Sequence, residues 1–378
     1  MTTVKMVKLG TLIKPAKLQK CGNDDYPVLS MTMHNGLVFQ SDKFKKSVAS
    51  QDKSTYKVVH RNQLVIGFPI DEGVLATQRI TDAGIVSPAY GIWDVDQTKI
   101  VPEFLEYALR CNRAIDYYKA KLRGSTARRR SLPTPTLLEL DVPLPDIEQQ
   151  RLALTTLHHA KNALDSRQAQ LTKLDELIKA RFVEMFGDPV TNPFNWPTVE
   201  LGQRCEIITG NTPSRAEPEN YGTYIEWIKS DNINTPSTFL TLAQEYLSEV
   251  GFQKCRFVES GSLLMTCIAG SLNCIGNVAV TNRRVAFNQQ INAITPTCDN
   301  VLYLYWLMIL SKPAIHKTIN MALKGILSKS QLSSIKFPFP PIECQNQFAA
   351  FVEEVDKSKL LAELFAQNAC ILAENRSK

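Results

Sequence analysis

The side chains best suited to chemistry in this sequence are cations and amides that gather in a few loops. Arginine and lysine bind phosphates, arginine also pairs with guanine, and asparagine and glutamine pair with adenine. Solvated turns and helix caps are the competing interpretation of the same residue types. From this chemistry we predict DNA contacts by Arg123, Gly124, Ser125, Arg128, Arg129, Arg130, Thr212, Ser214, Arg215, Lys229, Asn232, Arg283, Arg284, Asn288, Gln289, Lys324, Lys329 and Ser330.

Two of these basic loops occupy matching places in the chain. Leu122-Arg-Gly124 and Leu323-Lys-Gly325 each follow a helical stretch and precede a Pro-rich segment. A duplicated basic loop favours a shared role in binding a polyanion. The net charge of +6 agrees with such a partner, although a charge of this size occurs in many other proteins.

Signatures of catalysis and metal binding are missing from the sequence. It has no Gly-x-Gly loop for a dinucleotide or S-adenosylmethionine, no nucleotide-phosphate loop, and no Glu-x-Lys or Asp-x-Lys pair for a metal-dependent nuclease. Its nine cysteines are scattered without a Cys-x-x-Cys pair, which favours buried thiols in a reducing compartment over a zinc site. We therefore predict no catalytic residue, no bound metal or cofactor, no membrane span and a cytoplasmic location.

Two stretches have the pattern of long helices. From Ile147 to Phe186 the sequence contains no Gly or Pro, and a helix of that length is about 60 Å long. Apolar residues recur every seventh position in both stretches, which predicts two helices packed against each other. A coiled coil between two separate chains is the alternative. The predicted contact residues are Leu157, Leu164, Leu171 and Ile178 in the first stretch and Phe348, Val355, Ala362 and Ala369 in the second.

The chain also repeats itself. Pro143 to Gln150 reads Pro-Leu-Pro-Asp-Ile-Glu-Gln-Gln, and Pro338 to Gln345 reads Pro-Phe-Pro-Pro-Ile-Glu-Cys-Gln. Val7-Lys-Leu-Gly10 likewise corresponds to Val199-Glu-Leu-Gly202. We predict an α/β fold with an internal pseudo-twofold duplication, in which two long antiparallel coiled-coil helices separate two globular domains of mixed strands and helices. The predicted boundaries are 1–145, 146–188, 189–340 and 341–378.

These motifs resemble the DNA specificity subunits of type I restriction-modification enzymes. Lys179 to Pro189 is similar to the end of that family's central helix. Thr209-Gly-Asn-Thr-Pro-Ser-Arg215, Tyr224 to Asp231 and Ile275 to Val280 are similar to segments of its target recognition domains. One departure is that the N-terminal domain has Gly10-Thr-Leu-Ile-Lys-Pro15 in place of the Gly-x-Thr-Pro-Ser motif, so its DNA-contacting loops cannot be mapped from the second domain.

The resemblance implies a non-catalytic DNA-binding role. Residues 1–145 and 189–340 would each recognise one half of a bipartite asymmetric site in double-stranded DNA, while the helices fix the gap and dock modification subunits. Methyl transfer would belong to those modification (methyltransferase) subunits, and translocation and cleavage to restriction subunits. S-adenosylmethionine, ATP and Mg are accordingly expected in the partner subunits. The alternative is a helical scaffold or dimerisation protein without sequence readout.

Overall fold

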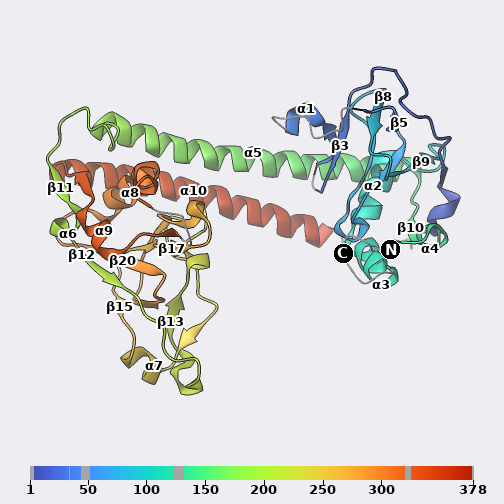
Figure 1. Cartoon of the computed structure of the whole chain (residues 1–378). Coiled ribbons are helices and arrows are strands. Elements are labelled where there is room, and N and C mark those ends of the chain that lie inside the picture. The colour runs from blue at the N-terminus through green and yellow to red at the C-terminus, as the bar shows by residue number, and fades with distance from the viewer. Residues whose placement is uncertain (1–3, 34, 44–51, 123–131, 320–324, 377–378) are drawn as a thin grey trace. The chain divides into compact units, whose positions relative to one another are not determined.

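The computed structural model describes residues 4–33, 35–43, 52–122, 132–319 and 325–376, with only the backbone for Lys43 and for 361–376. The chain divides into two compact units, Met1–Ala163 (unit 1) and Leu164–Lys378 (unit 2). Figure 1 shows that both combine short strands with helices, as the sequence predicts. Among the helices in these described ranges, none combines the length and apolar character needed to cross a lipid bilayer.

Unit 1 is built around a four-stranded antiparallel sheet with the strand order β2-β9-β6-β7. Two-stranded antiparallel pairs β1·β10, β3·β4 and β5·β8 flank it. Its strands are β1 (Met6–Lys8), β2 (Ile13–Pro15), β3 (Leu29–Thr32), β4 (Gly36–Phe39), β5 (Lys57–His60), β6 (Leu64–Ile66), β7 (Leu75–Thr77), β8 (Ala83–Val86), β9 (Gly91–Val95) and β10 (Asp141–Pro143). Its helices are α1 (Gln40–Lys43), α2 (Pro102–Arg110), α3 (Asn112–Lys121), α4 (Thr134–Leu138) and the first part of α5 (Ile147–Phe186).

Unit 2 contains an antiparallel sheet β12-β20-β16-β18 and a second sheet β14-β13-β19-β15, in which β13 and β19 are parallel. The strands are β11 (Thr198–Glu200), β12 (Cys205–Thr209), β13 (Tyr221–Ile228), β14 (Tyr246–Leu247), β15 (Phe257–Val258), β16 (Leu263–Thr266), β17 (Ile268–Ala269), β18 (Val278–Val280), β19 (Val285–Phe287), β20 (Ile291–Pro296), β21 (Gly325–Ile326) and β22 (Lys336–Pro338). The helices are the rest of α5, α6 (Leu201–Arg204), α7 (Glu249–Gln253), α8 (Val301–His316), α9 (Lys329–Ser334) and α10 (Ile342–Arg376).

The same framework recurs in both units, which confirms the predicted duplication. The strand order β2-β9-β6-β7 of unit 1 matches β12-β20-β16-β18 of unit 2. In unit 1 a Cβ added to Gly10 would lie 3.2 Å from the Leu138 Cβ, and in unit 2 one added to Gly202 would lie 3.1 Å from the Ser333 Cβ. A glycine thus lies at the same place in each unit, where the chain packs closely against a short helix.

A buried glutamine is the second matched feature. In unit 1 the Gln150 amide accepts a hydrogen bond from the Val101 N–H (2.8 Å) and donates to the Pro145 carbonyl (2.8 Å). In unit 2 the Gln345 amide accepts from the Asn300 N–H (2.9 Å) and donates to the Pro340 carbonyl (2.9 Å). Each glutamine thus joins the first turn of a long helix to the start of another helix, α2 in unit 1 and α8 in unit 2.

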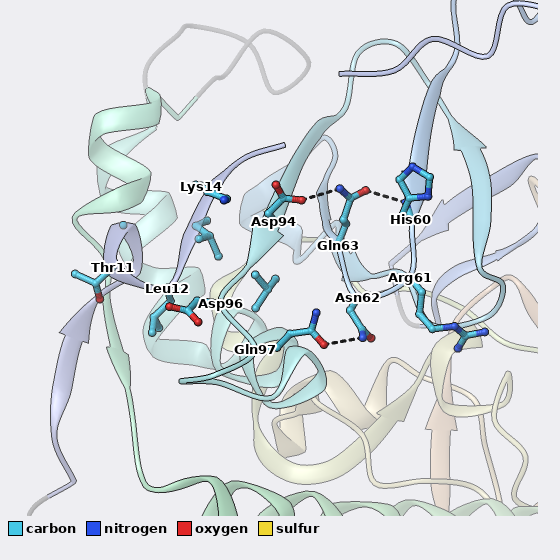
Figure 2. Close-up of a pocket in the computed structure, with 13 residues that line it drawn as sticks. Thr11, Leu12, Lys14, His60, Arg61, Asn62, Gln63, Asp94, Asp96 and Gln97 are labelled. Carbon is cyan, nitrogen blue, oxygen red and sulfur yellow. Dashed lines mark hydrogen bonds between the residues drawn. The ribbon is translucent and has the colours of Figure 1, made fainter. Parts of the chain in front are cut away.

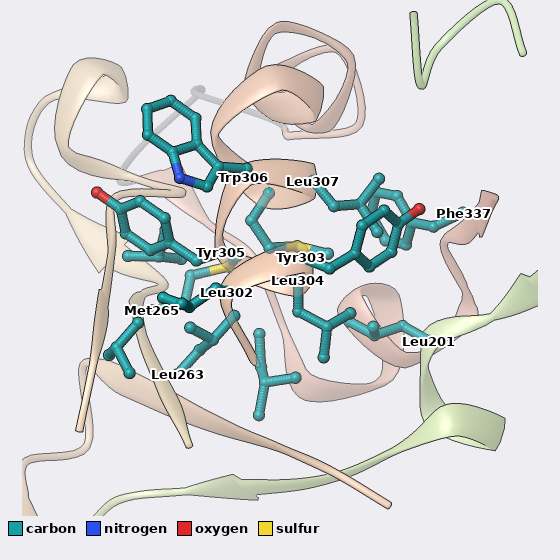
Figure 3. Packing of buried hydrophobic residues seen from close by; sticks show 14 of the residues in the cluster. Leu201, Leu263, Met265, Leu302, Tyr303, Leu304, Tyr305, Trp306, Leu307 and Phe337 are labelled. Atoms are coloured by element: carbon teal, nitrogen blue, oxygen red, sulfur yellow. The ribbon is translucent and has the colours of Figure 1, made fainter. Parts of the chain in front are cut away.

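Helix α8 forms the centre of the unit 2 core. Every residue from Leu302 to Met308 is buried, so the first two turns of the helix are covered on all sides. Figure 3 shows Leu263 and Met265 of β16 on one side of α8 and Phe337 of β22 on another. The Tyr303 ring stacks on Phe182 of α5 with centroids 5.5 Å apart.

Within unit 2, α5 and α10 pack in antiparallel order. Phe186 contacts Phe348 (ring centroids 5.6 Å apart), Arg181 lies over Phe351, and Asp175 pairs with Lys359 at 2.8 Å. Along these three contacts the residue number falls on α5 while it rises on α10, so the two helices run antiparallel. The predicted helix pair is therefore present within this unit.

The predicted contact residues on the helices are correct only in part. Ile178, Phe348 and Val355 are buried, and Leu171 is half-buried. Leu157 and Leu164 are 41% and 51% exposed, and because the α10 side chains beyond residue 360 lie outside the described residues, their predicted contact with the second helix stays a prediction. On α5 the buried residues Ile178, Phe182 and Phe186 recur every four residues and face the globular core, whereas a seven-residue repeat follows a different line along the helix. The side chains of Ala362 and Ala369 lie outside the described residues.

Candidate nucleic-acid interface

Three loops of unit 2 are held together beside the end of β12. The Asn211 N–H donates to the Phe287 carbonyl (3.1 Å), and the Asn211 side chain donates to the Lys254 carbonyl (2.8 Å) and accepts from the Arg256 N–H (2.8 Å). A Cβ on Gly210 would lie 2.3 Å from the Asn288 carbonyl oxygen, so only glycine fits this close approach. These contacts fix the backbone of the Gly-Asn-Thr-Pro-Ser motif.

This arrangement brings together several of the predicted DNA-contacting residues. The Thr212 hydroxyl donates to the Gln289 side-chain oxygen, which joins two loops that are far apart in the sequence. Both residues are exposed, and so is Ser214. The fixed loops therefore present a hydroxyl and an amide to solvent, and these are groups that bind bases or phosphates.

Arg215 and Lys229 form a cluster around two aromatic rings. The Arg215 guanidinium lies 4.4 Å from the Tyr221 centroid and 5.3 Å from that of Trp227, and the Lys229 Nζ lies 5.3 Å from the same Trp227 ring. Both cations also pair with Glu245. The hydrogen bond from Lys229 and the one from Arg215 outweigh the desolvation of Glu245 and lower the pKa of its carboxyl group.

Three other predicted residues have a different role. Arg283 pairs with Glu226 through two of its nitrogens and donates to the Thr241 carbonyl (3.1 Å), and its hydrogen bonds lower the pKa of Glu226. Asn232 is 5% exposed and donates to the Leu242 carbonyl, while Asn288 is 7% exposed and accepts from the Gln290 N–H. These contacts give all three side chains a structural role inside the domain, and their predicted contact with DNA stays a prediction.

The remaining predicted residues of unit 2 lie at its surface. Arg284 is exposed and pairs with Glu259 (2.6 Å), and its guanidinium lies 5.4 Å from the Phe257 ring centroid. Lys329 and Ser330 are exposed in the first turn of α9, which the Ser328 side chain caps. The predicted residues Arg123, Gly124, Ser125, Arg128, Arg129, Arg130 and Lys324 lie outside the described residues.

A polar hollow of about 590 Å³ lies at one end of the central sheet of unit 1. Figure 2 shows the Gln63 amide bonded to Asp94 (2.8 Å) and the Asn62 amide bonded to Gln97 (2.8 Å) across it. Hydrogen bonds from Lys99 and Thr98 lower the pKa of Asp96 in its lining to about 2. Because carboxylates lie among the cations, the hollow does not select a polyanion, and none of the predicted DNA-contacting residues lines it.

Sequence reasoning missed Asn211, Glu245 and the two buried glutamines. Gln150 and Gln345 occupy the same position of the repeated Pro-x-Pro motif. A polar residue kept at one place in both copies was a signal for a shared buried role. Asn211 and Glu245 gave no comparable signal, because the partners of their side chains are separated from them by 16 to 45 residues.

The fold and the fixed loops define a duplicated α/β framework that carries a candidate DNA-binding surface. Residues 193–366 match the family described as Type I restriction modification DNA specificity domain. The match confirms the resemblance identified in the sequence for this part of the chain.

Two curated relatives are similar to the chain. The chain is 28% identical over 176 residues to the type I restriction enzyme HindI specificity subunit of Haemophilus influenzae, and this match covers 45% of the chain and 37% of the relative. It is 22% identical over 280 residues to the putative MjaX specificity subunit of Methanocaldococcus jannaschii, covering 69% and 63%. The chain thus spans less than two thirds of the length of either relative.

Solved structures show the same fold over nearly the whole chain. The type I restriction-modification S subunit from M. genitalium superposes with a TM-score of 0.57 at 13% identity, covering 99% of this chain and 96% of that one. A chain from a structure on complex assembly of the type I R-M system gives a TM-score of 0.57 at 16% identity, covering 98% and 94%. At this identity the likeness concerns the fold alone.

Proposed function

We propose that this chain is the DNA sequence-specificity subunit of a type I restriction-modification complex. The observation that carries the proposal is that the framework of unit 2, which matches the DNA specificity domain family, recurs in unit 1. Two copies of one framework suit the recognition of two half-sites. We retain 1–145 and 189–340 as the target recognition domains and 146–188 and 341–378 as the helical spacer.

The two domains would recognise different sequences. Beside its repeated sheet, unit 1 carries the pairs β3·β4 and β5·β8, whereas unit 2 carries the sheet β14-β13-β19-β15. Base recognition depends on the side chains that reach the groove, and these elements supply different ones. Two domains that recognise different half-sites would give an asymmetric bipartite site.

The long helices would set the gap between the half-sites. Helix α5 has 40 residues, and a helix of that length spans about 60 Å. One turn of B-DNA is about 34 Å, so this length corresponds to roughly one and a half to two turns. The spacer and its flanking surfaces would also dock the modification subunits.

In this proposal the chain contributes recognition and its partners contribute chemistry. Modification subunits would transfer the methyl group from S-adenosylmethionine, and restriction subunits would use ATP and Mg. The chain would act in the cytoplasm, where the DNA is. In unit 2, Thr212, Arg215, Lys229 and Gln289 are the side chains we assign to the DNA surface.

Deleting the coding sequence and mapping methylated adenines across the host genome tests the proposal. We expect methylation to vanish at one bipartite motif and to return when the intact chain is supplied. An unchanged methylation map would contradict the proposal. Equal affinity of the purified chain for all duplexes would instead favour a scaffold without sequence readout.

A further inference from the structure

Glu245 joins two of the cations that we assign to the DNA surface of unit 2. Its Oε2 accepts a hydrogen bond from the Arg215 Nη2 at 2.7 Å, and its Oε1 pairs with the Lys229 Nζ. The side chains of Glu245 and Arg215 are 34% and 57% exposed. One carboxylate thus neutralises part of a two-cation cluster that remains accessible from solvent.

The two aromatic rings hold these cations independently of the carboxylate. Trp227 is 3% exposed on β13, so its ring is fixed, and both Arg215 and Lys229 lie against it. Tyr221 supports Arg215 on a further side. Cation–π contacts of this kind keep a charged group in place without neutralising it. Removing the Glu245 charge would therefore release positive charge without dispersing the cluster.

The pair Glu226–Arg283 in the same unit shows what a structural ion pair looks like here. Its side chains are 12% and 27% exposed, and the Arg283 guanidinium also donates to the backbone carbonyls of Leu240 and Thr241. The Arg215 guanidinium makes one hydrogen bond among the described residues and keeps its other N–H groups free. Of these two pairs, it is the Glu245 cluster whose arrangement allows it to exchange its partners for a ligand.

We propose that Glu245 determines specificity in unit 2 by repelling DNA phosphates while accepting a hydrogen bond from a base amino group in the major groove. Sequence-independent binding comes from phosphate contacts, and the carboxylate opposes them at the point where Arg215 and Lys229 would attract them. Cytosine N4 is the amino group that carboxylates bind in the major groove. A duplex that offers such a donor gains a hydrogen bond that offsets the repulsion, whereas other duplexes do not. The Glu245 carboxylate therefore acts as a repulsive element that favours one sequence.

This inference rests on the proposed function and is tested with the full chain and two duplexes. One duplex carries the methylation motif mapped in the host, and the other has the same length with that motif scrambled. For Glu245→Gln we expect the affinity for the scrambled duplex to rise about threefold to tenfold at low salt. The salt-dependence slope should steepen by about 1 as the repulsion is lost. The ratio of the two affinities should fall about tenfold, as expected for one lost base contact.

Two further variants make the result decisive. Glu206→Gln removes the same charge from an exposed position on β12, and the Glu206 side chain has no ion pair in the described part of unit 2. It should shift both affinities alike and leave their ratio unchanged. Glu245→Asp keeps the negative charge and should retain most of the discrimination between the two duplexes. If substitution at this position simply disrupted folding, Glu245→Asp would lose the discrimination too.

The possible failures are distinguishable. If the wild-type chain binds both duplexes equally, the proposed function fails. If the wild-type chain discriminates and Glu245→Gln changes both affinities by the same factor, whether upward or downward, only the role of Glu245 is refuted.

Discussion

The Gln345 side chain provides a sharp test of how the long helix is attached to unit 2. It is fully buried, and it accepts from the Asn300 N–H (2.9 Å) and donates to the Asp299 carboxylate (2.8 Å) and the Pro340 carbonyl (2.9 Å). Asp299 is also held by Arg204. We predict that Gln345→Ala destabilises unit 2, because the part-buried Asn300 N–H and the buried Pro340 carbonyl then lose their partner.

The size of the effect follows from those groups. Each unsatisfied buried polar group costs about 1–3 kcal/mol, so the loss of two partners costs about 3 kcal/mol. Asp299 keeps its pairing with Arg204 and adds less. In a domain the size of unit 2, 1 kcal/mol corresponds to about 2–4 °C, so the midpoint of its unfolding should fall by about 6–12 °C.

Gln150 supplies a matched control for the chemistry of this attachment. Its amide donates to the carbonyls of Lys99 and Pro145 and, among the residues that the structure describes, to no carboxylate. Gln345→Glu would place a carboxyl against Asp299, and burial beside a like charge raises the pKa of the new group. A raised pKa means that the variant is most stable below about pH 4.3, the ordinary value for glutamate, and loses stability as the pH rises through the raised value. This loss should be smaller for Gln150→Glu.

Thermal unfolding and amide hydrogen exchange of the full chain measure these effects. The Asn300 amide should lose protection in Gln345→Ala, and the Val101 amide should lose it in the matching Gln150→Ala, because each substitution removes the accepting side-chain oxygen. Unchanged protection at Asn300 in Gln345→Ala would refute the reasoning. The same pH dependence in Gln150→Glu and Gln345→Glu would refute the role given to Asp299.

Three further predictions concern unit 2. Gly210→Ala should destabilise unit 2 and weaken DNA binding, since its Cβ would lie 2.3 Å from the Asn288 carbonyl oxygen; urea unfolding and DNA binding both report on it. Arg215→Ala should weaken binding to duplexes and lower the salt-dependence slope by about 1 with little change in stability. Arg283→Ala should instead lower the free energy of unfolding by about 3 kcal/mol or more, because it leaves Glu226 unpaired. The reverse pattern in binding and unfolding assays would contradict both roles. The pKa of Glu226 is lowered chiefly by its hydrogen bond from Arg283, so the stability from this pair is present above the ordinary pKa of glutamate and lost as the pH falls through the lowered value. Arg283→Gln should remove that acid-sensitive part, as unfolding free energies measured between about pH 3 and 7 would show.

The architecture was predictable because the sequence motifs of its framework occur twice in the chain. The repeated Pro-x-Pro motif and the Gly10 and Gly202 segments occupy corresponding places in the two units. Helix α5 runs from Ile147 to Phe186, the stretch without Gly or Pro. The buried face of α5 was harder to predict, because it depends on where the aromatic residues of α8 and α10 meet it.

The candidate site was predictable only as a set of loops. Arg283 and Arg284 are neighbours in the sequence, yet the first is bound to Glu226 inside the domain and the second is exposed. Glu226 lies 57 residues away, so no local pattern separates the two arginines. Tertiary contacts determine which polar groups already have a hydrogen-bond or ion-pair partner. They therefore also determine which groups remain to bind a ligand.

Selection of bound duplexes from a random-sequence library by the full chain, supplied with its modification subunits, tests the central claim most directly. We predict enrichment of two defined blocks of bases that differ from each other and are separated by a constant number of undefined base pairs. Enrichment of a single block, or of two blocks with a variable gap, would contradict the account.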